Sequence, residues 1–218
     1  MEIISELFDA ILTNNIEKVK ELLQTKNKLY ENEFLDTYLE TPLMLASRKK
    51  HIEVVKLLLE NGANAANEHG KTALTNAIFW GHKEIVKLLL ENGALIDDND
   101  MFVPITLQEK DVLEVCLKNC TTHAKNKALW SSVLLDYKDG AELSLKHGAD
   151  INALHEDVKN GDTPFIAAVR CRRINIIELL IQYGADQSIK NNKGKTALDL
   201  AKTKKIKNIL LKQKDGDA

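Results

Sequence analysis

The sequence predicts an all-α chain built from repeated pairs of short helices. Three segments share one order of residues: a Thr, a first apolar stretch, a polar break, a second apolar stretch and a closing Gly. Thr41, Thr72 and Thr163 each precede their Gly by 21 residues. Within the stretches, apolar residues recur at the three- and four-residue intervals of one helix face. A fixed internal period of this kind indicates a repeat architecture.

Composition excludes several classes of protein. The chain has 218 residues, of which 44% are hydrophobic and 28% charged, as is typical of soluble globular proteins that bury a core. The chain has a formal charge of −2 and so lacks the excess of basic residues that is typical of nucleic-acid-binding proteins. Apolar runs such as Val54–Leu59 are interrupted by Lys and are too short to span a membrane. We therefore expect neither a nucleic-acid partner nor a membrane partner.

The cysteines and the N-terminus bear on the compartment. Cys116, Cys120 and Cys171 form an odd set without the spacing of a disulfide framework, which favours a reducing environment. The acidic N-terminus lacks the basic start of a signal peptide. We expect a cytoplasmic protein and a monomer.

The first elements form an N-terminal cap followed by two regular repeats. Leu7–Leu12 and Ile16–Gln24 are predicted as two helices split at Asn14-Asn15, with Ser5 standing where later units have Thr. Thr41 is placed to cap a helix and Pro42 to start it. The predicted boundaries are 3–30 for the cap, then 37–66 and 67–97 for the repeats.

The middle of the chain is degenerate. Val112–Cys120 aligns with Val54–Gly62, with Cys120 replacing the Gly, yet Val103 lies only 17 residues before Cys120. The first helix of this unit should therefore be short, and residues 97–127 should form the weakest part of the stack. Lys127–Gly148 keeps the spacing of 21 but lacks the Thr. The predicted boundaries here are 98–121 and 122–153.

The C-terminal part returns to the regular pattern. Thr163–Ala185 follows a long loop, Ala153–Asp162, and forms the repeat 159–187. Thr196 opens the last unit, whose second helix, Lys204–Lys212, is strongly basic. A polar outer face suits a C-terminal capping repeat, predicted over 188–213.

Four strings carry a resemblance to a known family. TPLMLA at Thr41–Ala46, GHKEIVKLLLENGA at Gly81–Ala94, KHGADIN at Lys146–Asn152 and GKTALDLA at Gly194–Ala201 resemble ankyrin repeats. The resemblance implies a single ankyrin-repeat domain over residues 1–218. It also implies a solenoid of stacked helix-turn-helix units with short β-turn or hairpin loop tips and a concave face. Such a scaffold binds proteins, although a fold alone does not name a function.

Two sets of residues resemble ligand sites only in part. Gly70-Lys71-Thr72 and Gly194-Lys195-Thr196 look like the end of a phosphate-binding loop, but Ala65 and Ile189 stand where that loop needs a Gly. The acidic loop at residues 97–100 lacks the fifth and sixth positions of a calcium-binding loop. We interpret both as turns.

Cys116, Cys120 and His123 are the nearest approach to a metal cluster. The two cysteines lie four residues apart on one predicted helix, but no fourth ligand is apparent nearby. We interpret Cys116 as a packed core residue. The sequence predicts no catalytic residue, no cofactor and no metal ion.

The partner-binding residues are predicted from their position in the repeat, as the resemblance implies. In ankyrin-like stacks, variable contacts come from loop tips and from the end of the first helix. Trp80 and the arginines are typical anchors of protein interfaces, whereas Phe79, Leu134 and Leu135 have packing between repeats as an alternative, which we favour for the two leucines. Trp130 is predicted in the core. The predicted binding residues are Tyr38, Arg48, Lys49, His69, Lys71, Phe79, Trp80, Leu134 and Arg170, with Glu40, Glu68, Asn126, Asp162, Leu135 and Cys171 at neighbouring positions.

Two classes of function remain at this point. The first is a protein-binding module acting as an adaptor, an inhibitor or an immunity-type protein. The second is an enzyme with a site in the degenerate region 97–127. Small size and the lack of an attached catalytic domain favour the first.

Overall fold

The computed structural model describes residues 2–24, 40–65, 73–154 and 160–211. The chain divides into two compact units, residues 1–96 and residues 97–218. The described residues of both units are helical and include no β-strand, which confirms the predicted all-α fold. None of these helices is long and apolar enough to cross a membrane.

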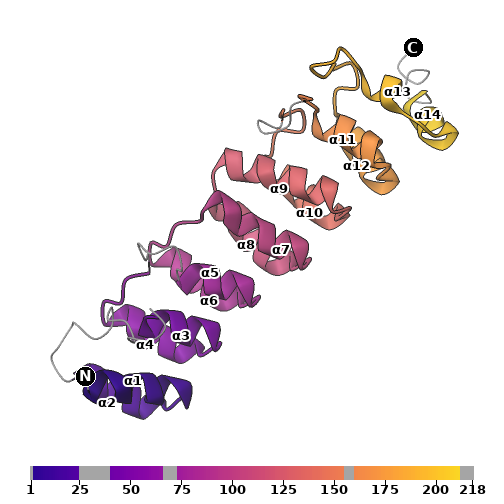
Figure 1. The fold of residues 1–218 in the computed structure, drawn as a ribbon. Helices are drawn as coiled ribbons and strands as arrows, with labels where there is room; N and C mark the ends of the chain where they lie inside the picture. Colours follow the sequence, from indigo (N-terminus) through magenta and orange to yellow (C-terminus); the bar gives the residue numbers. More distant parts are fainter. Residues whose placement is uncertain (1, 25–39, 66–72, 155–159, 212–218) are drawn as a thin grey trace. The chain divides into compact units, whose positions relative to one another are not determined.

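The first unit stacks three helix pairs in two layers (Figure 1). The first helices of the pairs, α1, α3 and α5, pack side by side, and the second helices, α2, α4 and α6, pack behind them. Apolar side chains at helical spacing fill the space between the layers, among them Val54, Leu58, Leu74 and Leu89, all fully buried. Each such side chain stabilises the fold by about 1.5–3 kcal/mol. The helices are α1 (Glu2–Leu12), α2 (Ile16–Gln24), α3 (Pro42–Arg48), α4 (Ile52–Glu60), α5 (Ala73–Phe79) and α6 (Lys83–Glu91).

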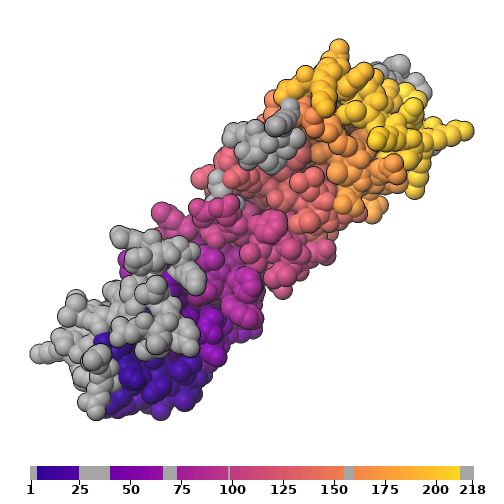
Figure 2. Space-filling model, in the orientation of Figure 1, coloured from indigo at the N-terminus to yellow at the C-terminus, as the bar shows by residue number. Residues whose placement is uncertain are grey.

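The second unit repeats this layering from η2 onward. The helices α9, α11 and α13 pack side by side, while α8, α10 and α12 form the other layer. One apolar cluster runs from Leu129 through Phe165 to Leu210. On the face drawn in Figure 2, side chains fill the spaces between the ribbons of this unit. The elements are η2 (Asp98–Met101), α7 (Phe102–Thr106), α8 (Lys110–Asn119), α9 (Thr122–Leu134), α10 (Lys138–Lys146), α11 (Pro164–Cys171), α12 (Ile174–Gln182), α13 (Ala197–Leu200) and α14 (Lys204–Leu211).

The start of the chain differs from the prediction. The first helix begins at Glu2, before Ser5, so Ser5 lies within α1 and does not open it. Residues 2–6 contain neither Gly nor Pro, and acidic side chains near the N-terminus of a helix stabilise it through their interaction with the helix dipole. Later starts follow the expected chemistry, since the Thr41 and Thr163 hydroxyls accept hydrogen bonds from the backbone N–H of Met44 and Ile166.

The degenerate middle is built differently from its neighbours. The first helix of its helix pair, α7, spans only five residues and is preceded by the 3-10 turn η2. Cys120 is extended, with φ −107°, so the chain passes directly into α9 without the glycine turn that ends α4 and α6. Thr121 caps α9, so the helix begins before Lys127, the position equivalent to the Thr of regular repeats, and Asn126 lies inside the helix. The boundary between the two compact units falls at Ile96 and Asp97, where the predicted weak region begins.

One turn recurs six times. In the six pairs from α1–α2 to α11–α12, the residue two positions before the second helix is left-handed: Asn14, Lys50, Gly81, Gln108, Asp136 and Arg172, with φ between 52° and 69°. The N–H of the next residue bonds the carbonyl five residues earlier, as His51 does with Ala46 and His82 with Ala77. This is the Schellman arrangement, which satisfies the orphan carbonyls at a helix end. Two residues of each first helix end, immediately before the left-handed position, are thereby fixed in equivalent places.

Of the six residues at this position, only Gly81 adopts the left-handed conformation without a steric penalty from a Cβ atom. The variant Gln108→Gly measures that penalty at one of the other five turns. The penalty of about 1–2 kcal/mol for a side chain exceeds the extra unfolded-state entropy of glycine, about 0.5–1 kcal/mol. We expect the glycine variant to raise the free energy of unfolding by about 0.5–1 kcal/mol in urea titrations. Gln108→Ala keeps the Cβ and should bring no gain; equal stability of the two variants would contradict the argument.

Candidate functional site

The six turns present two side chains each, at the two residues immediately before the left-handed position. In the first unit these are Leu12 and Thr13, Arg48 and Lys49, and Phe79 and Trp80, which are exposed except for the partly buried Arg48. Because α3 packs between α1 and α5, the basic pair lies between two less polar ones. We call these six residues, together with Lys50, the turn-end surface of the first unit.

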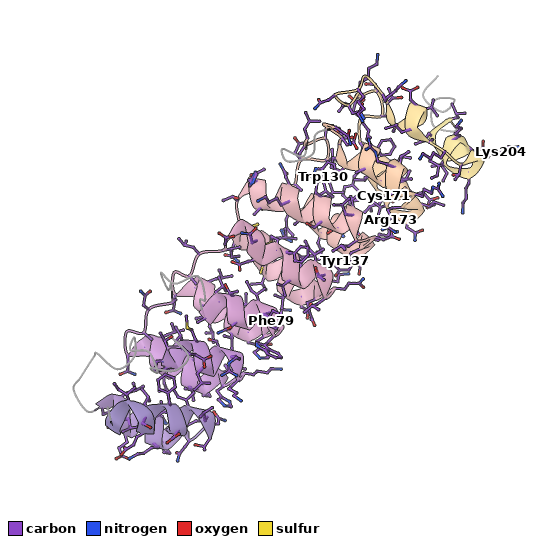
Figure 3. The ribbon with its side chains drawn as sticks, viewed as in Figure 1. Phe79, Trp130, Tyr137, Cys171, Arg173 and Lys204 are labelled. Carbon is purple, nitrogen blue, oxygen red and sulfur yellow. The ribbon has the colours of Figure 1, made fainter. Side chains whose placement is uncertain are left out.

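Phe79 and Trp80 form an exposed aromatic pair. Their rings meet edge to face, with centroids 5.3 Å apart and an interplanar angle of 79°. The side chains are 52% and 53% exposed. Phe79, labelled in Figure 3, ends α5 and does not extend the core between repeats, as the alternative interpretation required. The pair is a preformed apolar projection.

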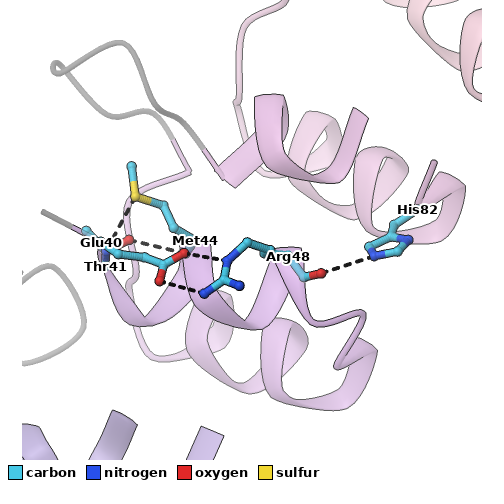
Figure 4. Close-up of polar contacts among 5 residues, drawn as sticks. All are labelled: Glu40, Thr41, Met44, Arg48 and His82. Carbon is cyan, nitrogen blue, oxygen red and sulfur yellow. Dashed lines mark hydrogen bonds and ion pairs between the residues drawn. The ribbon is translucent and has the colours of Figure 1, made fainter. Parts of the chain in front are cut away.

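Arg48 is held in place by an acid from the preceding loop. Its Nε and one terminal nitrogen donate to the two carboxylate oxygens of Glu40, at 2.9 and 3.0 Å (Figure 4). These hydrogen bonds to Glu40 raise the pKa of the guanidinium above its usual value. Both residues were predicted at contact positions, and the structure shows that they pair with each other. Their charges largely cancel, whereas Lys49 and Lys50 make no ion pair within the described part of the chain.

His82 links the turn of one repeat to the repeat before it. Its Nε2 lies 3.3 Å from the backbone carbonyl oxygen of Arg48, at the end of α3 (Figure 4). Burial lowers the pKa of the ring, the bond to Arg48 raises it, and the nearby Lys50 lowers it, with a net lowering. Burial and Lys49 also lower the pKa of His51. At the equivalent position of the preceding repeat, Nε2 of His51 is buried without a hydrogen-bond partner among the described residues.

The same position makes the same bond with other residues in the second unit. The hydroxyl of Tyr137 donates to the carbonyl of Gln108 at 3.3 Å, and Arg173 donates to the carbonyl of Leu134 at 2.9 Å. Imidazole, phenol and guanidinium thus each tie a turn to the helix end of the preceding pair. A stacked scaffold can retain this contact while its chemistry changes.

Leu134 and Leu135 are 46% and 44% exposed at the turn end of α9. The preference for packing between repeats was therefore wrong, because the left-handed Asp136 ends the helix and turns both side chains outward. Leu12 and Leu107 are exposed at equivalent places and were missed. Turn-end positions cannot be found by counting forward from the Thr in units that lack this residue. Counting back from the start of the second helix locates both Leu12 and Leu107.

Arg170 belongs to a partly buried network. It contacts both carboxylate oxygens of Asp162, at 2.9 and 2.7 Å, and Asn191 donates to the same carboxylate at 2.9 Å. Asp162 is only 3% exposed. The side chain of Asn191 also accepts from the backbone N–H groups of Lys193 and Lys195, which shapes the loop containing Gly194-Lys195. This loop, which resembled a phosphate site, is organised by its own asparagine.

The other candidates in the middle also have structural roles. Asp97 accepts from the N–H of Asn99, and the Asp97 N–H donates to the carboxylate of Asp100, so the acidic loop is a helix cap. Burial raises the pKa of the Cys116 thiol to about 12, with smaller contributions from Asp100 and Cys120. Among the residues that the structure describes, no group of three or more His, Cys, Asp or Glu is placed to hold a metal ion.

The remaining predicted positions divide into buried and undescribed ones. Trp130 is 4% exposed, and its indole N–H donates to the carbonyl of Ala153 at 3.2 Å, as expected for a core residue. Asn126 accepts from the backbone N–H of Asp150 at 2.8 Å and so braces the next loop. Cys171 is exposed beside Arg170. Tyr38, Glu68, His69 and Lys71 lie outside the described residues.

Comparison with known proteins places this architecture in a family. A model of ankyrin repeats (3 copies) matches residues 7–100 and 129–217. The chain belongs to the ankyrin-repeat family. The mouse B-cell lymphoma 3 protein homolog is 30% identical over 195 residues, covering 88% of this chain and 39% of that protein. This ankyrin-repeat chain thus spans less than half of that relative.

Solved structures agree with the assignment. The ankyrin repeat domain of Bcl-3, described as a unique member of the IkappaB protein family, matches with a TM-score of 0.81 and 22% identity over 94% of this chain and 97% of that one. The human ASB11 ankyrin repeat domain matches with a TM-score of 0.66 and 28% identity, covering 94% of this chain and 96% of that one. The first likeness shows the fold. The family supports a protein-interaction module, since its matched members are ankyrin scaffolds.

The lowered pKa values of His51 and His82 predict a stability that depends on pH. The folded state favours the neutral rings, so their contribution is present above the ordinary pKa of 6.5 and is lost as pH falls through the lower folded values. The free energy of unfolding should fall between about pH 8 and about pH 5. The double variant His51→Gln and His82→Gln should lose less over this range, as measured by urea unfolding at each pH. An unchanged pH dependence in that variant would contradict the prediction.

Proposed function

We propose that this chain binds a protein partner through the turn ends of its first helices and its loop tips. The observation that carries the proposal is the exposed Phe79–Trp80 pair, fixed beside the basic end of α3. Exposed aromatic side chains on a rigid support suit a desolvated contact at low entropic cost. The proposed binding residues are those predicted from the sequence, together with Leu12 and Leu107.

The role is that of a scaffold that covers its partner, as an adaptor, an inhibitor or an immunity-type protein. We propose that it acts in the cytoplasm as a monomer, without a nucleic-acid or membrane partner. Both compact units belong in this proposal to one ankyrin-repeat domain, with capping units at 3–30 and 188–213. The odd number of cysteines and the net charge of −2 support these assignments.

The alternative of an enzyme in residues 97–127 has less support. Met101, Ile105, Leu113 and Cys116 are buried there as an apolar core. The carboxylates of Asp97 and Asp100, in the loop that resembles a calcium-binding loop only in part, cap η2. The residues in this region that resemble metal ligands thus have structural roles, and the scaffold function accounts for more of the surface.

Trp80→Ala tests the proposal. Affinity capture from native lysate with the full chain should recover a partner that the variant loses, with binding weakened by about 2 kcal/mol or more. The fold should lose much less, because half of the indole is already exposed. A core tryptophan would instead cost about 3–5 kcal/mol of stability.

Tyr183→Ala is the matched control. It removes another exposed aromatic side chain, at the end of α12 in the second layer of helices. This variant should retain the partner in the same capture. If Trp80→Ala and Tyr183→Ala retain the same proteins with equal affinity, the turn-end surface does not bind the partner.

A further inference from the structure

The turn-end surface of the first unit combines exposed apolar side chains with two lysines that form no ion pair with any residue that the structure describes. Leu12, Phe79 and Trp80 are about half exposed, at 49%, 52% and 53%. Lys49 and Lys50 are exposed between them, at the end of α3. Exposed apolar groups that cluster on a rigid element favour a partner that removes them from water. The two lysines would then need negative charge opposite them, since leaving them unpaired costs affinity.

The position of Lys50 relative to the aromatic pair is fixed by two observations. His82, two residues after Trp80, contacts the carbonyl of Arg48, which fastens the end of α3 to the turn after α5. The charge of Lys50 acts on the ring of His82, so the ammonium group lies close to this turn. The cation and the aromatic pair therefore belong to one surface and can contact one segment of a partner.

We propose that this surface binds an acidic protein segment that carries an aliphatic or aromatic residue among its Asp and Glu side chains. One apolar residue of the segment contacts Phe79 and Trp80, a second contacts Leu12 on the other side of the end of α3, and the carboxylates contact Lys49 and Lys50 between them. This inference rests on the proposed protein-binding function and adds the chemistry of the partner.

A nucleic acid could also use lysines and stack on aromatic rings. Three features favour a protein segment. Arg48, the residue best suited to grip phosphate, is already engaged by both oxygens of Glu40. Leu12 offers an aliphatic contact that stacking does not need, and the whole chain has a net charge of −2. Binding to an oligonucleotide is therefore an outcome that would overturn the proposal.

The C-terminal repeat offers a competing basic surface. Residues 190–207 contain seven lysines and one aspartate. The large exposed apolar residue of this region is Leu211, and its other apolar side chains, such as Ile206 and Leu210, pack into the core. It could attract an acidic segment but would offer little for an apolar anchor. A direct comparison of the two surfaces therefore belongs in the test.

Selection from a random peptide library displayed against the full chain is the first test. Enriched peptides should have negative net charge and contain Leu, Phe or Trp. Enrichment of neutral or basic peptides, no enrichment, or tighter binding of a single-stranded DNA oligonucleotide than of the selected peptides would each overturn the proposal.

Charge reversal then locates the contact, using one selected acidic peptide as the probe. The double variant Lys49→Glu and Lys50→Glu should weaken binding about tenfold or more. Lys56→Glu with Lys87→Glu changes the net charge equally on the second helices α4 and α6 and should leave affinity within about twofold. Lys49→Gln with Lys50→Gln gives an intermediate loss and repeats the test if the reversed variant unfolds. A loss confined to Lys204→Glu with Lys205→Glu would assign the peptide to the C-terminal repeat and overturn the proposal.

The outcome can be separated from that of the proposed function. If Trp80→Ala abolishes capture of the native partner but the selected peptides are not acidic, binding stands and the inferred chemistry is wrong. If Trp80→Ala leaves capture unchanged as well, both fail.

Discussion

The left-handed turn that recurs between the two helices of six pairs is the constraint on which the surface depends. It satisfies the carbonyls of the first helix end and fixes the direction in which the second helix leaves. The two residues before it are thereby placed at equivalent positions, whatever their side chains. This explains how one scaffold can present Arg48 and Lys49 in one pair and Phe79 and Trp80 in the next. The turn requires only a particular backbone geometry at the end of the helix. The side chains there can therefore vary and are available for binding.

The contacts between neighbouring pairs follow the same logic. His82, Tyr137 and Arg173 occupy one position and each bonds a backbone carbonyl at the turn of the preceding pair. A carbonyl accepts from any of these donors, so the contact tolerates substitution. Arg48 and Arg170 likewise pair with the acid eight residues before them. These contacts hold the ends of the first helices rigid, which lowers the entropic cost of binding there.

Much of the fold could be predicted from the sequence because the regular repeats carry local signals. Thr41 with Pro42 marks a helix start, and the apolar spacing from Ile16 to Gln24 matches α2. The start of α9 could not be read from the repeat spacing of 21, because Cys120 replaces the closing glycine and its extended backbone leads directly into the helix. The surface was predicted less well. Exposure of Leu134 depends on where a left-handed residue ends the helix, and the Arg170–Asp162–Asn191 network joins residues distant in sequence.

The central claim is that the turn ends of the first unit contact the partner. Photo-crosslinking tests it most directly, with a photoreactive amino acid introduced at Thr13, which is exposed at the end of α1 and leaves Trp80 intact. The same residue at Lys87, on α6, serves as the comparison. The account predicts crosslinks to the captured protein from position 13 and few from position 87. Crosslinks that form from position 87 alone would contradict it.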